Sequence, residues 1–198
     1  MRSADAARYR KISRFLSVVL RHEPHRIGLK LDAQGWASID ELVDRARAHG
    51  VHLTHDMVLC VAETSDKQRF AYDGAGRIRA NHGHTIAIDL GLEPSEPPRI
   101  LFHGTAATSV ASIRAEGLKP GRRQQVHLSS NAITAASVGR RHGWPVVLRV
   151  AARRMWSSGF KFVRSASGVW LTNAVPAEFI QFPHLPSPDE CPDFAPPP

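Results

Sequence analysis

Apolar residues near the start of the chain recur with the spacing of one helical face. From Ile12 to Leu20 they fall at positions i, i+3, i+4, i+7 and i+8, which predicts a helix turned toward a core. Pro24 is expected to end this helix, because proline cannot continue the backbone hydrogen bonds. Apolar positions then alternate from Ile27 to Leu31, which predicts a short strand that leads into a turn at residues 32–35.

Capping residues predict two further helices. Ser38 stands three residues before Glu41, the spacing of a capping box, ahead of an apolar helical pattern that Gly50 ends. Thr54 can cap the helix that follows. The caps therefore predict a helix from about Ser38 to Gly50 and another after Thr54.

A small hairpin is predicted after these helices. Strands at residues 69–72 and 77–80 flank a turn, AspGlyAlaGly, at residues 73–76. Helices followed by a hairpin resemble a winged helix. We therefore expect residues 1–92 to form an N-terminal winged-helix lobe.

The second half of the chain is predicted to mix short helices and strands. Residues 92–98 combine prolines and acids, which interrupt both kinds of element, so a lobe boundary is placed there. The fold class is therefore α+β, with a second lobe at residues 93–183 and a Pro-rich tail, residues 184–198, predicted to be disordered. The expected strands lie at 99–102, 125–129, 145–151 and 168–173, and the expected helices at 108–116 and 131–141.

Charge distribution indicates a polyanionic partner. The 198-residue chain has a formal net charge of +8, and from Arg99 to Arg164 it contains 12 Lys or Arg and one acid, Glu116. Nucleic acid is the natural partner for such asymmetry. The alternative is that the 21 Arg against 5 Lys reflect genome composition and that the charge maintains solubility. Composition is compatible with both interpretations.

Several classes of protein are disfavoured by the sequence. Two cysteines, Cys60 and Cys191, suit neither a disulfide framework nor a Cys-rich zinc site, and a cytoplasmic location is expected. The chain shows no signal-peptide pattern and no apolar run of about 18 residues that could span a membrane. The histidine pairs at residues 52–55 and 82–84 lack a zinc-site frame, so no metal is expected.

Eight motifs occur in an order that is more specific than any one of them. They are KISRFLSVVLRHEP, LDAQGW, DKQRF, IRANHGHT, LFHGT, the GL…RRQQVHLS segment, VGRRHG and GVWLTNAVP. From about Lys11 to Phe182 the chain resembles the tRNA 2′-phosphotransferase family. The resemblance implies a winged-helix lobe, an ADP-ribosyltransferase-like NAD-binding lobe and an active site between them.

The resemblance also implies a reaction. Members of the family remove an internal 2′-phosphate from RNA, with NAD⁺ as the acceptor. The 2′-phosphate is first ADP-ribosylated with release of nicotinamide. Transesterification then gives RNA with a free 2′-OH and ADP-ribose 1″,2″-cyclic phosphate. A tRNA-like RNA carrying an internal 2′-phosphate is the implied partner.

Four positions match the catalytic residues of the family. Arg21 and His22 come from the LRH motif, Arg69 from the KxRF motif, and Arg123 precedes the VHLS strand, with Arg122 as its neighbour. The arginines are assigned to the phosphate, because a guanidinium donates bidentate hydrogen bonds to it and stays charged. His22 is assigned to acid–base work or to orienting the phosphate.

Further positions match the two binding surfaces of the family. The HGT motif and the VHLS strand are assigned to NAD, and the place that holds a catalytic Glu in the wider transferase fold corresponds to Val169. Departures from the family pattern occur at His82, Thr85, Gln125 and Ser167. The residues assigned to NAD are His103, Gly104, Thr105, His127, Ser129, Ser165 and Val169, and those assigned to RNA or phosphate are Lys67, His84 and Thr85.

Two alternatives to the 2′-phosphotransferase hypothesis stay open at this point. An enzyme of the same fold could stop after the first transfer and cap terminal phosphates of DNA or RNA, with 5′-phosphorylated ends as partners. A noncatalytic winged-helix protein could instead bind nucleic acid through its basic second half, with steep salt dependence and no NAD binding.

Overall fold

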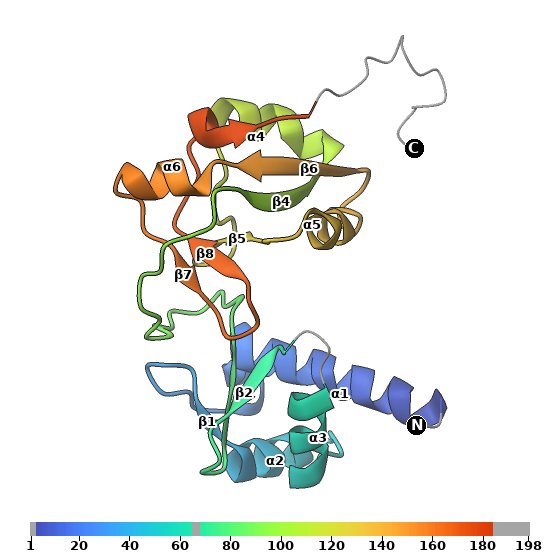
Figure 1. Ribbon diagram of the computed structural model, residues 1–198. Coiled ribbons are helices and arrows are strands. Elements are labelled where there is room, and N and C mark those ends of the chain that lie inside the picture. The colour runs from blue at the N-terminus through green and yellow to red at the C-terminus, as the bar shows by residue number, and fades with distance from the viewer. Residues whose placement is uncertain (1–2, 65–67, 184–198) are drawn as a thin grey trace. The chain divides into compact units, whose positions relative to one another are not determined.

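The computed structural model describes residues 3–64 and 68–183 and divides into two compact units (Figure 1). The first unit comprises Met1–Glu93 with the segments Gly121–Gln124 and Ser165–Ser167. The second comprises Pro94–Pro120, Gln125–Arg164 and Gly168–Pro198. Helices and small antiparallel sheets occur together, which confirms the α+β class. The predicted disordered tail lies outside the described residues, and none of the described helices is long and apolar enough to cross a membrane.

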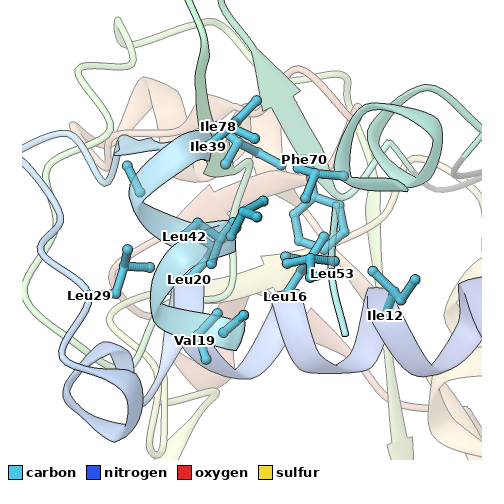
Figure 2. Packing of buried hydrophobic residues seen from close by; sticks show 14 of the residues in the cluster. Ile12, Leu16, Val19, Leu20, Leu29, Ile39, Leu42, Leu53, Phe70 and Ile78 are labelled. Atoms are coloured by element: carbon cyan, nitrogen blue, oxygen red, sulfur yellow. The ribbon is translucent and has the colours of Figure 1, made fainter. Parts of the chain in front are cut away.

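Three helices build the core of the first unit. Helix α1 spans Ser3–Arg21, α2 spans Ile39–Ala48 and α3 spans His55–Thr64. The predicted apolar face of α1 is buried, with Leu16 at 0% exposure, and it packs with residues of the other two helices (Figure 2). Burying one apolar stripe on each helix is what makes these short elements stable.

The predicted caps are present at both later helices. The Oγ of Ser38 accepts a hydrogen bond from the backbone N of Glu41 at 3.3 Å. The Oγ1 of Thr54 accepts one from the backbone N of Met57, also at 3.3 Å. Each side chain satisfies an amide that has no partner within its own helix.

A three-stranded antiparallel sheet completes the first unit, in the order β1-β3-β2. Strands β2, Phe70–Tyr72, and β3, Arg77–Ala80, form the predicted hairpin, and β1 is Ala37–Ser38. The strand expected at residues 27–31 was wrong. Pro24–Ile27 forms a 3-10 helix, and Ile27 at its end and Leu29 beyond it are buried without joining a ladder. Alternating apolar residues were buried by helix packing rather than by strand pairing.

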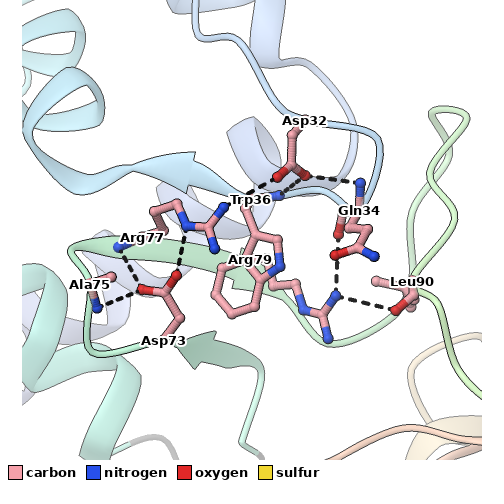
Figure 3. A network of polar contacts seen from close by, with 8 residues as sticks. All are labelled: Asp32, Gln34, Trp36, Asp73, Ala75, Arg77, Arg79 and Leu90. Carbon is pink, nitrogen blue, oxygen red and sulfur yellow. Dashed lines mark hydrogen bonds and ion pairs between the residues drawn. The ribbon is translucent and has the colours of Figure 1, made fainter.

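A polar network attaches the segment after β3 to the turn before β1 (Figure 3). Asp32 Oδ1 accepts hydrogen bonds from the backbone N of Gln34 and Trp36, both at 2.9 Å. The Arg79 guanidinium lies 4.6 Å from the Trp36 ring centroid and donates to the carbonyl oxygen of Leu90 at 3.2 Å. Arg79 thus joins Trp36 by cation–π stacking and Leu90 by a charged hydrogen bond, which holds the segment 81–90 against the turn before β1.

In the described part of the second unit, two three-stranded antiparallel sheets and three short α-helices surround one core. Leu101, Leu148 and Phe162 are each fully buried there. One sheet has the order β4 (Leu101–Ala106), β6 (Pro145–Val150), β9 (Ile180–Gln181), and the other the order β5 (Val126–Leu128), β8 (Trp170–Thr172), β7 (Val163–Arg164). The helices are α4 (Val110–Glu116), α5 (Ala132–Gly139) and α6 (Ala152–Ser157).

Most elements predicted for the second unit are present, with three additions and one extension. Helix α6 and strands β7 and β9 were not predicted, since each is too short to show a period. Strand β4 runs on to Ala106, because each of its residues from Leu101 pairs with one of β6. The HisGlyThr motif is therefore part of a strand and not its exit.

Candidate functional site

Three arginines share one electrostatic environment in the first unit. Arg21 ends α1, Arg69 precedes β2, and Arg123 lies in the segment Gly121–Gln124. The Arg21 Nη2 donates a hydrogen bond to the carbonyl oxygen of Arg69 at 3.3 Å. Burial first, and then the charges of Arg69 and Arg123, lower the pKa of Arg21 to about 10. The positive charges of Arg69 and Arg123 repel that of Arg21, and an anion bound among them would offset this repulsion.

His22 is held beside this arginine cluster by the backbone and side chain of Thr85. The Nδ1 of His22 lies 3.1 Å from the Oγ1 of Thr85. The backbone N of Thr85 donates to the carbonyl oxygen of Arg21 at 3.0 Å. Burial, then Arg21 and Arg123, lower the pKa of His22, against a smaller opposite effect of Glu23. The imidazole is therefore mainly neutral at pH 7 and can accept a proton.

His84 is buried, with 3% of its surface exposed. Burial, followed by the charges of Arg21, His22 and Arg79, lowers its pKa to about 4, so the ring is neutral at pH 7. Its carbonyl oxygen accepts a hydrogen bond from the backbone N of Gln124 at 3.2 Å. His84 thus attaches the segment that carries Arg123 to the rest of the first unit.

Asn81 positions Arg69 and was missed by the sequence analysis. This residue is 6% exposed, and its Nδ2 donates to the carbonyl oxygen of Gln68 at 2.6 Å. Its backbone N donates to the carbonyl oxygen of Arg69 at 2.9 Å. Gln68 has a positive φ of 40°, the only such non-glycine among the described residues, so this turn is strained and needs support. The one signal in the sequence was an Asn directly after a predicted strand.

The predicted NAD residues of the second unit lie on two neighbouring strands. His103 is on β4, and its Nδ1 lies 3.0 Å from the carbonyl oxygen of His127 on β5. His103 and Thr105 pair across the sheet with Leu148 and Val146, so they lie on the face that these buried residues share. An imidazole and a hydroxyl are thereby fixed on one face of β4.

Gly104 has a packing role in the second unit. Gly104 was assigned to NAD with the rest of the HGT motif. In the structure, a Cβ added at Gly104 would collide with the carbonyl group of Ala135 on α5. A Cβ at Gly139 would lie 2.7 Å from the carbonyl oxygen of Thr105. The two glycines therefore allow α5 to pack directly on β4, and the space at Gly104 is already filled.

The remaining predicted residues are placed as follows. The Ser129 Oγ donates to the carbonyl oxygen of Asn131 at 3.0 Å and so supports the residue that caps α5. Ser165 belongs to the first unit, where its Oγ lies 2.9 Å from that of Ser167. Val169 is half-buried between β7 and β8. Lys67 lies outside the described residues.

Comparison with known proteins identifies the family. Residues 7–174 match the profile described as "RNA 2'-phosphotransferase, Tpt1 / KptA family". A protein of Acaryochloris marina named "Probable RNA 2'-phosphotransferase" is 50% identical over 169 residues, which is 85% of this chain and 93% of that protein. One of Streptomyces coelicolor with the same name is 51% identical over 173 residues, 87% of this chain and 94% of that protein. The chain belongs to the RNA 2′-phosphotransferase family.

Proposed function

We propose that this protein transfers an internal 2′-phosphate from RNA to the ribose of NAD⁺, with release of nicotinamide and of RNA that carries a 2′-OH. Family membership supports the phosphotransferase activity. The observation that carries the proposal is the cluster of Arg21, Arg69 and Arg123, in which burial, and then the charges of the other two arginines, lower the pKa of Arg21. Such a cluster is suited to a phosphate dianion.

The first transfer requires positioning more than proton chemistry. A phosphate monoester has a second pKa of about 6, so at neutral pH it is already a dianionic nucleophile. Arg69 and Arg123 hold its oxygens while one oxygen forms the bond to the ribose C1″ and the bond to nicotinamide breaks. Nicotinamide leaves as a neutral molecule, so no strong acid is needed, and holding the reacting atoms in line supplies most of the rate.

The second transfer places negative charge on the phosphoryl oxygens and on the departing RNA oxygen. The ribose 2″-OH attacks phosphorus and the bond to the RNA 2′-oxygen breaks. Arg21 stays charged at neutral pH even with a pKa of about 10, so it can stabilise this charge. His22, mainly neutral and hydrogen-bonded to Thr85, accepts the proton of the attacking hydroxyl and returns it to the departing 2′-oxygen.

The residues of the second unit fit a dinucleotide in their chemistry. Bound NAD⁺ would supply the ribose that receives the phosphate. His103 and Thr105 offer an imidazole and a hydroxyl from one face of β4. The contact with the carbonyl oxygen of His127 fixes the His103 ring. The missing side chain of Gly104 lets α5 pack against the strand that carries both residues. An ADP-ribosyltransferase-like fold for this unit, and a winged-helix fold for the first, are part of the proposal.

The test is an assay of NAD-dependent phosphate removal from an RNA oligonucleotide with one internal 2′-phosphate. The wild-type protein is expected to release nicotinamide and 2′-OH RNA in equal amounts. Arg69→Ala is expected to lose most activity, whereas Arg10→Ala, which removes an exposed charge from α1, keeps it. Failure of the folded wild-type protein to remove the phosphate contradicts the proposal. Stable ADP-ribosylated 5′ ends would favour the terminal-phosphate alternative.

A further inference from the structure

A second group of arginines lines a cavity in the second unit. The cavity has a volume of about 770 Å³ and lies where β4 begins, β6 ends, α6 begins and β9 starts. Arg99, Arg149, Arg153 and Arg154 are all exposed and all line it. We call these four residues the arginine pocket. None of them has a role in the reaction proposed above.

Strand register separates Arg149 from the residues assigned to NAD. Arg149 pairs with Phe102 of β4 and with Gln181 of β9, whereas His103 pairs with Leu148. Neighbouring residues along a strand point to opposite faces. Arg149 therefore lies on the face of this sheet opposite to that of His103 and Thr105, and the arginine pocket is a separate site within the second unit.

Two of the four guanidinium groups are held in place by the protein. Arg153 forms an ion pair with Glu96 at 2.7 Å, and its Nε donates to the carbonyl oxygen of Pro97 at 3.0 Å. Arg154 donates to the carbonyl oxygen of Glu178 at 3.1 Å and lies 4.6 Å from the Phe179 ring centroid. Charges held in this way lose less conformational entropy when they bind an anion.

The other two guanidinium groups are available to a ligand. Within the part of the chain that the structure describes, the side chains of Arg99 and Arg149 form no hydrogen bond or ion pair. Among the described residues that line the cavity, Glu178 is the one carboxylate, and Glu96 outside the lining is paired with Arg153. Four positive charges against these two negative charges give the arginine pocket a preference for anions.

We infer that the arginine pocket binds the sugar–phosphate backbone of the RNA substrate, at phosphates other than the one that is transferred. Four guanidinium groups spread over several elements match a ligand with repeated phosphates better than one small anion. Arginine is also the side chain best suited to bidentate phosphate contacts. The inference depends on the proposed function only in taking RNA as the substrate.

The test measures the salt dependence of binding to an unmodified transfer RNA transcript. Each lost phosphate contact lowers the slope of log K against log salt by about 0.7 to 0.9. The double variant Arg99→Gln/Arg149→Gln is therefore expected to lower the slope by about 1.4 and to weaken binding about 25-fold at 0.1 M salt. Glu178→Gln, which removes the opposing charge, is expected to tighten binding about threefold.

A matched control removes two charges elsewhere in the same unit. Lys119→Gln/Lys161→Gln changes the net charge equally at exposed positions outside the cavity and is expected to leave the slope unchanged. An unchanged slope in the arginine double variant, or equal losses in both double variants, overturns the inference. So does a double variant that loses binding to polyglutamate but not to RNA, because the pocket would then serve an acidic polypeptide.

Activity on a short substrate separates this inference from the proposed function. A 2′-phosphorylated trinucleotide is too short to provide the additional backbone phosphates, so it reports the reaction alone. We expect the arginine double variant to lose efficiency on a full-length 2′-phosphorylated RNA relative to the trinucleotide. Inactivity of the wild-type protein on the trinucleotide would contradict the proposed function and leave the binding experiment valid.

Discussion

Replacing Arg21 with methionine is expected to make the ligand-free protein more stable while removing a phosphate contact. The guanidinium is largely buried, and its Nε has no hydrogen-bond partner among the described residues. Arg69 and Arg123 add repulsion. Methionine has a similar length, carries no charge and can occupy the same space beside Phe70. Arg21→Met is thus predicted to raise the free energy of unfolding and to lower the activity.

The expected gain in the free energy of unfolding follows from the pKa of Arg21. A pKa of about 10, against an ordinary value of about 12.5, corresponds to about 3 kcal/mol of unfavourable free energy for the charged form. Because the folded-state pKa is lowered, this cost is fully present below about pH 10 and disappears as the pH rises above the ordinary value. The hydrogen bond to Arg69 and the contact with Phe70 return about 1.5 kcal/mol. The expected net gain is about 1 to 2 kcal/mol.

Urea unfolding at pH 7, with and without inorganic phosphate, measures this effect. Phosphate at ten times its dissociation constant should stabilise the wild-type protein by about 1.4 kcal/mol and the methionine variant by much less. Arg21→Lys, which keeps the charge, serves as the control and should show no comparable gain. A methionine variant that is less stable than wild type would show that the charge of Arg21 does not destabilise the fold, and equal stabilisation of both proteins by phosphate would show that Arg21 does not bind it.

Three further predictions concern single residues. Gly104→Ala should lower the free energy of unfolding by about 3 kcal/mol or more, because its Cβ would displace α5, whereas the exposed Ser137→Ala should change it by less than about 0.5 kcal/mol; equal urea midpoints would contradict this. The lowered pKa of His84, about 4, predicts that stability is fully present above about pH 6.5 and falls by up to about 3 kcal/mol toward pH 4. His84→Asn should flatten this pH profile of the urea midpoint, and a parallel profile would argue against it. Thr85→Val removes the side-chain contact with His22 and should lower kcat about tenfold without changing the KM for NAD⁺. Steady-state kinetics that show an unchanged kcat would contradict this.

The helices of the first unit could be predicted because their apolar residues follow the helical period and their caps are local. Ser38 and Thr54 act within three residues of themselves, so sequence spacing is sufficient to recognise them. The segment at residues 27–31 misled the prediction because alternation shows only that two side chains are buried. Whether a partner strand is present depends on distant parts of the chain.

In the candidate site, too, residues within local motifs could be predicted, whereas roles that depend on distant parts of the chain could not. Motif order selected Arg21, Arg69 and Arg123, and the structure groups their charges in one unit. Asn81 was missed because it acts on the backbone of a neighbouring strand. The packing role of Gly104 could not be predicted because the helix that fills the space beside it begins 28 residues later in the chain, at Ala132. The catalytic and binding roles of these residues stay predictions.

The central claim is that the phosphate moves from RNA to an NAD-derived ribose. It is tested most directly by following a radiolabelled internal 2′-phosphate in RNA during incubation with the protein. The account predicts that, only when NAD⁺ is present, all of the label leaves the RNA and appears in an ADP-ribose phosphate. Label that remains on the RNA, or that appears as inorganic phosphate without NAD⁺, would contradict it.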